Sequence, residues 1–238
     1  MYFDVHCHLH EFDEEEIKSF KDFIIVAVAD DLETSNKTLM LAQKYGNILP
    51  CIGIHPWVVD ETPMSHLRDF ERLLANHEVA GIGEVGLDKR FVPNSYSRQL
   101  EFFKVFIKMA VDYDLPMNIH APDAWRDVYE LLVRYDVNKA VIHWYTGPLD
   151  LLEEIVGKGY YISINPALEL QKKHMKVAVE VDLRAMLVES DGPYEYRGLK
   201  LTPRMIPKLM GLIADMRGIK IQELQSIVEM NFRRLFKK

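Results

Sequence analysis

The feature that most restricts how this chain can fold is a series of eight short apolar runs, distributed over nearly its whole length. Each run is almost continuously apolar, which is typical of parallel strands that are covered on both faces. The predicted strands are residues 2–6, 23–29, 47–54, 79–84, 115–120, 140–143, 160–164 and 185–191.

Amphipathic segments lie between several of these runs. Residues 97–111 carry an apolar residue at spacings of three and four, which predicts one buried helix face. Its members are Leu100, Phe103, Phe106, Ile107 and Ala110. Further helices are predicted at 124–135, 149–156, 206–216 (with Gly218 as the C-cap) and 221–236.

Strands that alternate with helices predict an α/β fold, and eight such units predict a (β/α)8 TIM barrel. The 238 residues, 48% of them hydrophobic, suffice for one well-buried core, so we expect a single domain over residues 1–238. The alternative is an open doubly wound sheet, but no glycine fingerprint follows the first strand to support it.

The net charge and the two cysteines limit the functions and the cellular location that we expect for this chain. A formal net charge of −7 argues against a general nucleic-acid coat protein, although bound cations would still let an enzyme act on phosphates. Cys7 and Cys51 form no CxxC motif, so we expect a reducing, cytoplasmic location, with Cys7 as a packed core thiol. The chain opens directly on a predicted strand, and its longest apolar run, residues 23–29, is too short for a membrane span. We therefore expect a soluble protein without a membrane partner.

Side chains that can bind metal stand at the ends of five predicted strands. They are His6, His8, Glu84, His120, His143 and Asp191. Because active sites of such barrels lie at the carboxyl ends of the strands, we expect these side chains to form one site.

The types of these residues indicate metal-assisted hydrolysis. His6 and His8 share one face of an extended strand, and the two oxygens of Glu84 can bridge two cations. Catalytic zinc normally uses three protein ligands, so this larger set suits two divalent ions of the Zn, Mn or Mg type. Asp191 can bind metal and accept a proton from water. Asp4 either orients an imidazole of this site or caps the start of the strand.

Several short motifs, in order along residues 4–236, resemble the TatD family of metal-dependent deoxyribonucleases, in the amidohydrolase-like superfamily of barrels. They are Asp4-Val5-His6-Cys7-His8-Leu9, Gly53-Ile54-His55-Pro56, Gly83-Glu84-Val85-Gly86-Leu87-Asp88, Gln99, Leu115-Pro116 with Ile119-His120, His143 with Gly147, Glu189-Ser190-Asp191-Gly192-Pro193 and Asn231-Phe232-Arg233-Arg234-Leu235-Phe236.

The resemblance implies a role for each position. His6, His8, Glu84 and Asp191 would hold one ion, while Glu84, His120 and His143 would hold a second. Glu84 and Asp191 would be catalytic, as the bridge and as the group that activates water. His55 would face the substrate. The implied activity is cleavage of phosphodiesters in DNA, often from the 3′ end.

The chain departs from the family pattern where substrate would be contacted. Pro122 replaces a common arginine, Leu201-Thr202-Pro203 stands where Asn-Glu-Pro is usual, and His55-Pro56-Trp57 replaces His-Pro-His. Nearby cations could bind phosphate in their place, or form a solvated loop surface: Lys89, Arg90, Arg197, Lys200 and Arg204. Aromatic residues near the strand ends either stack on bases or pack at the rim: Trp57, Trp125, Trp144 and Tyr145.

Three functions are compatible with the sequence. The first is a deoxyribonuclease with two metal ions. The second is a binuclear hydrolase of an amide, lactone or acyl-tRNA ester, which the acidic charge and Pro122 favour. The third is a non-enzymatic metal-binding barrel, which the absence of cysteine ligands and the size of the ligand set disfavour. We expect no obligate protein partner, and a monomer or a weak homo-oligomer.

Overall fold

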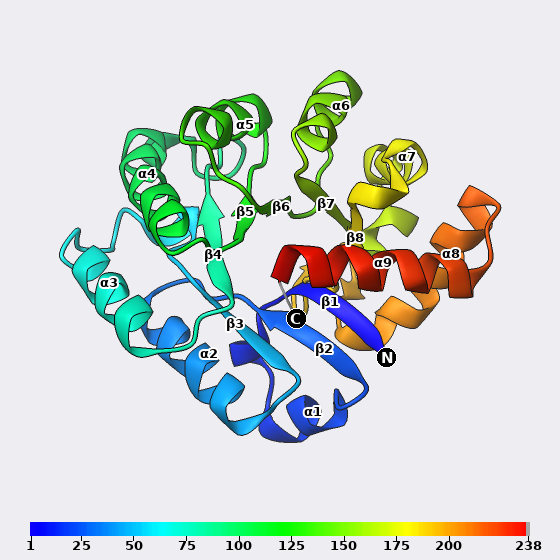
Figure 1. Ribbon diagram of the computed structural model, residues 1–238, viewed down its shortest axis with the longest axis horizontal. Coiled ribbons are helices and arrows are strands. Elements are labelled where there is room, and N and C mark those ends of the chain that lie inside the picture. Colours follow the sequence, from blue (N-terminus) through cyan, green and yellow to red (C-terminus); the bar gives the residue numbers. More distant parts are fainter. Residues whose placement is uncertain (237–238) are drawn as a thin grey trace.

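A computed structural model describes residues 1–236 and shows eight parallel strands in consecutive order around a barrel (Figure 1). The strands are β1 (Tyr2–Cys7), β2 (Phe23–Ala27), β3 (Ile48–Ile52), β4 (Gly81–Gly86), β5 (Met117–His120), β6 (Ala140–Ile142), β7 (Tyr161–Ile164) and β8 (Met186–Val188). Each predicted run overlaps one of them, and β1 and β4 extend one and two residues beyond their runs, which confirms the predicted α/β barrel.

Helices surround this barrel, as the ring in Figure 1 shows. They are α1 (Glu14–Ser19), α2 (Leu32–Lys44), α3 (His66–Asn76), α4 (Tyr96–Asp112), α5 (Trp125–Arg134), α6 (Leu149–Gly157), α7 (Lys172–Glu180), α8 (Ile206–Arg217) and α9 (Ile221–Phe236). The five predicted helices are present, and Gly218 ends α8 in the left-handed conformation with φ 63°.

Four helices, α1, α2, α3 and α7, are absent from the prediction. In α2 the fully buried residues are Ser35, Thr38 and Leu39, two of them small and polar. A mixed face of this kind gives a weak apolar periodicity. The helix α3 is different, because it buries Leu67, Phe70 and Leu74 at spacings of three and four, so its pattern is present in the sequence.

The first and last strands meet where the barrel closes. The amide of Asp191 donates to the carbonyl of His6 at 2.9 Å, and the amide of His8 donates to the carbonyl of Gly192 at 2.8 Å. Nearer the start of β1, α9 packs against this strand, and the rings of Phe3 and Phe232 are 4.7 Å apart. The closure places the segment after β8 beside the end of β1.

The interior of the barrel is apolar except at its carboxyl end. Cys7 and Cys51 are buried free thiols, as expected for packed core residues. A short hairpin, β9 (Glu195–Tyr196) with β10 (Leu199–Lys200), follows β8 on the same side as the other βα loops. Within residues 1–236, no helix combines the length and the apolarity that crossing a bilayer requires.

Candidate metal centre

The six side chains predicted to bind metal meet at the carboxyl end of the barrel. His8, Glu84, His120, His143 and Asp191 line one cavity of about 370 Å³. His6 lies directly beneath it and is fully buried. Parallel strands bring their carboxyl ends to one edge, which is why residues so distant in sequence converge here.

Glu84 stands at the centre of this group with 1% of its surface exposed. It lies on β4 between two glycines that let β4 approach β5 closely. A Cβ on Gly83 would lie 2.6 Å from the Cβ of Asn118, and one on Gly86 would lie 1.9 Å from the carbonyl oxygen of His120. The glycines therefore place the Glu84 carboxylate between side chains of β1 and β5.

One oxygen of Glu84 belongs to a group that we call the first cluster, with His6, His8 and Asp191. Glu84 Oε2 lies 3.3 Å from the Nε2 atoms of both His6 and His8, which are themselves 3.3 Å apart. Asp191 Oδ1 lies 3.4 Å from His6 Nε2 and 3.6 Å from His8 Nε2. Ligand atoms about 2.1 Å from a tetrahedral ion are about 3.4 Å apart. The spacing of these four atoms therefore fits one divalent cation.

The other oxygen of Glu84 belongs to the second cluster, with His120 and His143. Glu84 Oε1 lies 2.8 Å from His120 Nδ1 and 2.9 Å from His143 Nε2. The two imidazole nitrogens are 3.3 Å apart. One carboxylate thus faces two separate groups of nitrogen ligands, as a bridging ligand would.

Asp191 reaches the first cluster from a loop, and not from a strand as predicted. Strand β8 ends at Val188, and Asp191 has φ 55°, a left-handed conformation that is uncommon outside glycine. The backbone bond from Asp191 to His6 holds this conformation and turns the carboxylate into the cavity.

The outer nitrogens of His6 and His120 face acceptors. Asn118 donates its Nδ2 to the carbonyl of Val5 at 2.6 Å, so its Oδ1, 2.8 Å from His6 Nδ1, must be an acceptor. Asp88 Oδ2 lies 2.9 Å from His120 Nε2. Each of these contacts holds the proton on the outer nitrogen, which leaves the inner nitrogen free to bind a cation.

Carboxylates lie near the outer nitrogens of His8 and His143, at ion-pair distance rather than in hydrogen bonds. Asp30 Oδ1 lies 3.1 Å from His8 Nδ1, and Glu189 Oε1 lies 3.6 Å from His143 Nδ1. Ser163 and Asn165 donate to Glu189 and fix its position. The outer nitrogens of His6 and His120 are therefore held by hydrogen bonds, while those of His8 and His143 face carboxylates.

His55 also contacts Glu84 but has the opposite arrangement. Its Nε2 lies 3.4 Å from Glu84 Oε1, while the backbone N–H of Trp57 donates to its Nδ1 at 3.2 Å. Because Nδ1 accepts, the proton of the neutral ring must lie on the inner Nε2. Burial lowers the pKa of His55, which favours this neutral form. His55 is therefore a hydrogen-bond donor toward the cavity.

In the absence of cations, protons occupy this site. Burial opposes ionisation of Glu84, but the surrounding imidazoles hold the pKa of its carboxyl well below the usual range. Burial and neighbouring His143 oppose a charge on His6, but the carboxylates of Glu84 and Asp191 raise its pKa to about 10. Cation binding would displace such protons, as is general for metal sites.

Asp4 does not orient an imidazole. Its Oδ1 accepts from the backbone N–H groups of His6 and Ser190, at 3.2 and 2.9 Å, and burial raises its pKa to about 7. The interpretation of Asp4 as a partner of an imidazole is therefore wrong, and the carboxyl instead joins β1 to the segment after β8.

Among the predicted substrate-contacting cations, Arg90 lines the cavity. Lys89 instead pairs with Asp127 and lies over the ring of Tyr96, so it turns away from the cavity. Arg197, at the turn of the β9–β10 hairpin, lies over the ring of Tyr196. Within residues 1–236, the residues that line the cavity include neither Lys89 and Arg197 nor Lys200 and Arg204.

Aromatic side chains form two walls around the clusters. We call Trp57 and Phe91 the first wall; Trp57 donates its Nε1 to Asp88 at 2.6 Å. The second wall is Trp144 with Tyr194 and Tyr196, whose rings lie 6.0 and 5.2 Å from it. Trp57, Phe91 and Tyr194 are 46%, 57% and 45% exposed, so their rings are available to a ligand.

The two remaining predicted aromatic residues belong mainly to the core. Trp125 is 7% exposed and Tyr145 is fully buried, with its hydroxyl donating to the carbonyl of Pro148. They pack against each other with ring centroids 4.8 Å apart. Trp125 also lines the cavity, so packing at the rim, the alternative considered from the sequence, describes Trp125, while Tyr145 belongs to the core.

Sequence reasoning did not identify the groups behind the histidines. They are Asn118, Asp30, Asp88 and Glu189. A signal existed for Asn118, which is a polar residue inside an apolar run two positions before His120. Asp88 and Glu189 lie in motifs that were noted, but nothing local shows which imidazole each one meets.

The chain is similar to known proteins over its whole length. Residues 3–237 match the model of a family described as TatD related DNase. The chain is 29% identical over 247 residues to the uncharacterized metal-dependent hydrolase MJ1582 of Methanocaldococcus jannaschii, covering 100% of this chain and 97% of that protein. It is 28% identical over 260 residues to the human deoxyribonuclease TATDN3, covering 99% of this chain and 94% of that protein.

A solved structure has the same architecture. The chain superposes with a TM-score of 0.91 on YJJV, a TatD homolog from Escherichia coli k12, at 23% sequence identity. The similarity covers 100% of this chain and 98% of that one. At this identity the likeness concerns the fold.

Proposed function

The chain belongs to the TatD family of metal-dependent hydrolases, and on that premise we propose that it is a deoxyribonuclease that cleaves phosphodiester bonds with two divalent cations. The observation that carries the proposal is the bridging position of Glu84. Its two oxygens face two separate clusters of histidine nitrogens, at 3.3 Å in the first cluster and at 2.8 and 2.9 Å in the second.

Each cluster would hold one ion. His6, His8 and Asp191 would bind the first, His120 and His143 the second, and Glu84 would bind both. Mixed nitrogen and oxygen ligation suits Zn or Mn, with Mg as a harder alternative. When bound, such a pair lowers the pKa of water and stabilises the charge that develops on a phosphate.

The chain's own residues would supply the proton transfers and the orientation. Asp191 belongs to the first cluster and lines the cavity, where its carboxylate would accept the proton of the attacking water. His55 would donate its Nε2 hydrogen to a phosphate oxygen, since Trp57 holds the ring in that tautomer. Arg90 is the cationic group among the described cavity residues and would pair with the phosphate.

The aromatic walls favour an unpaired strand as the substrate. Bases stack on exposed aromatic rings with little dependence on sequence, and such stacking requires bases that are free of a duplex. These aromatic residues line the same cavity as the clusters, so bases next to a cleaved phosphate could stack on them. We propose that nucleotides are released from the 3′ end of such a strand, as the resemblance to the family implies.

The test is digestion of single-stranded oligonucleotides labelled at either end by protein loaded with Zn, Mn or Mg. We expect nucleotides to be released from the 3′ end, and a loss of at least about 1,000-fold in rate for Glu84→Gln and Asp191→Asn. Glu33→Gln and Asp136→Asn make the same charge changes at side chains that are 77% and 87% exposed and should match the wild type. Unchanged cleavage by the two site variants would show that the site assignment is wrong.

A second candidate is a binuclear hydrolase of an amide, lactone or acyl ester. It is favoured by the single arginine in an otherwise aromatic and acidic cavity wall, which is poor in cations for a polyanion. A panel of small esters, lactones and amides tested beside DNA separates the two. Turnover of the small substrates without any nuclease activity would replace the first proposal.

A further inference from the structure

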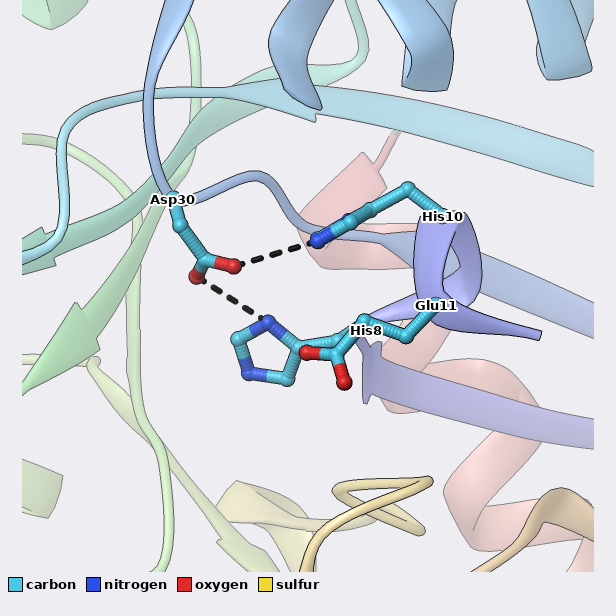
Figure 2. A group of neighbouring side chains, drawn as sticks. All are labelled: His8, His10, Glu11 and Asp30. Atoms are coloured by element: carbon cyan, nitrogen blue, oxygen red, sulfur yellow. Dashed lines mark ion pairs between the residues drawn. The ribbon is translucent and has the colours of Figure 1, made fainter. Parts of the chain in front are cut away.

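A second group of ionisable side chains adjoins the first cluster. His8, His10, Glu11 and Asp30 lie together, as Figure 2 shows. His8 follows β1, His10 and Glu11 lie in the short helix η1 (Leu9–Glu11), and Asp30 follows β2. The site described above uses His8 and the Asp30 carboxylate beside it, and gives no role to His10 or Glu11.

Asp30 joins the two histidines. Its Oδ1 lies 3.1 Å from His8 Nδ1 and its Oδ2 lies 3.1 Å from His10 Nε2, the two dashed lines of Figure 2. Each oxygen of the Asp30 carboxylate thus pairs with one imidazole. Glu11 lies beside them and is exposed.

His8 is held between two sets of groups. Its Nε2 lies 3.3 Å from Glu84 Oε2 and from His6 Nε2, inside the first cluster. Its Nδ1 faces Asp30 on the opposite side of the ring. A carboxylate 3.1 Å from Nδ1 favours the proton on that nitrogen by its charge, which leaves the Nε2 lone pair directed at the first cluster.

The backbone holds Asp30 firmly in this position. The amide of Asp30 donates to the hydroxyl of Thr34 at 2.9 Å, and its carbonyl accepts from the amide of His55 at 2.8 Å. These two bonds fix the main chain and leave the rotation of the carboxylate to be set by its side-chain partners.

His10 is the partner that sets this rotation. Its side chain is only 5% exposed, and within residues 1–236 its Nδ1 has no hydrogen-bond partner. Asp30 is thus the polar group that the buried His10 ring contacts. With one oxygen held by His10, the other is directed at His8.

We propose that Asp30 and His10 are positioning residues of the first cluster: His10 orients the Asp30 carboxylate, and Asp30 orients His8 toward the cation. The inference rests on the proposed role of the first cluster as a metal site. Groups that hold a metal-binding histidine in this way typically change metal affinity by about 10–100-fold when they are removed.

The experiment is a competition between the protein and a chromophoric chelator for Zn, with Co absorption spectra as a second readout of ligand geometry. In Asp30→Asn, one of two bound equivalents should weaken by about 10–100-fold and its Co spectrum should change. His10→Ala should weaken the same equivalent by about 3–10-fold, and His10→Gln, which can still donate to Asp30, should restore part of the loss.

A double variant tests whether His10 acts through Asp30. His10→Ala combined with Asp30→Asn should bind no more weakly than Asp30→Asn alone, since a residue that acts only through another adds nothing once that residue is changed. His77→Ala and Asp136→Asn change the same residue types at exposed positions and should bind both equivalents as the wild type does.

Several outcomes would overturn the proposal. Additive losses in the double variant would show that His10 acts independently of Asp30. A third equivalent in the wild type that disappears in His10→Ala would make this group a cation site in its own right. Wild-type affinity in Asp30→Asn would exclude positioning, while a wild-type protein that binds no cation would instead refute the proposed metal centre itself.

Discussion

Asn118 offers the sharpest test of the metal centre, because its two hydrogen bonds have separable consequences. Its Oδ1 accepts from His6 Nδ1 at 2.8 Å, and its Nδ2 donates to the carbonyl of Val5 at 2.6 Å. Asn118 is 1% exposed, so water cannot replace either bond when the amide is removed. Asn118→Leu keeps a similar volume and removes both.

The expected magnitude follows from the two groups left behind. The N–H of His6 and the carbonyl of Val5 would each be buried without a partner, at a cost of about 1–3 kcal/mol apiece. Leucine offsets a part of this by burying more apolar surface, at about 25 cal/mol per Å². We expect the free energy of unfolding of the metal-free protein to fall by about 2–4 kcal/mol.

The same change should weaken one bound cation. Without Asn118, the proton of His6 can move to Nε2 and the ring can rotate, so the first cluster should lose about 10–100-fold in affinity. Asn118→Asp keeps an acceptor for His6 but faces Val5 with an anion. It should therefore lose stability with a smaller loss of cation affinity.

The assays are urea unfolding of chelator-treated protein and titration of Zn against a chromophoric chelator. Asn76→Leu, at an exposed residue of α3, is the matched control and should change neither quantity substantially. If Asn118→Leu bound both cations as tightly as the wild type, Asn118 would not orient His6. If Asn118→Asp lost more affinity than Asn118→Leu, the assignment of the acceptor would be wrong.

Three further predictions concern the wall, the cations and a buried histidine. Trp144→Ala, in an Asp191→Asn background that does not cleave, should weaken binding of a fluorescent single-stranded oligonucleotide by about 1–3 kcal/mol; an unchanged anisotropy titration would exclude stacking there. Chelation should lower the melting temperature and Zn should restore it, because Zn at 100 times its dissociation constant stabilises the folded protein by about 2.7 kcal/mol. A melting temperature that does not change with Zn would contradict the proposed ligand set. Burial lowers the pKa of His174 to about 4 from an ordinary value of 6.5, while its ring accepts from Asn165 and faces the carbonyl of Tyr145. The pKa of His174 is lower in the folded than in the unfolded protein, so its contribution to the free energy of unfolding is present above pH 6.5 and is lost as the pH falls toward 4. The metal-free wild type should therefore lose about 3 kcal/mol more of this free energy over the window than His174→Gln. Parallel pH profiles of urea unfolding for the two proteins would contradict this.

Much of the fold could be predicted from the sequence because apolar runs report burial directly. Every predicted run overlaps a strand, although the boundaries differ. The run predicted to end at Asp191 extends past its strand, which stops at Val188, whereas Glu189, Ser190 and Asp191 form a buried loop. The helix α2 was not marked, since Ser35 and Thr38 occupy the face where an apolar stripe is expected.

The positions of the loop cations could not be predicted from the sequence. Lys89 and Arg90 are adjacent in a loop that leaves the end of β4, yet Arg90 lines the cavity while Lys89 pairs with Asp127. Asp88 decides this difference, because it accepts from the backbone N–H groups of Arg90 and Phe91 and so sets the path of the loop. Such a path depends on contacts between loops and has no local signature.

The sequence by itself determined that the chain forms a parallel barrel with six histidine and carboxylate side chains, of the types that bind metal, at one end. The physical reason is that hydrophobic periodicity defines the strands, and parallel strands bring their carboxyl ends together. Only the tertiary structure decided which nitrogen of each histidine faces the two clusters. That choice depends on Asn118, Asp30, Asp88 and Glu189, all of which come from other strands and loops than the histidines they face. The same dependence separates His55, whose inner nitrogen carries a proton, from the four histidines that can bind metal.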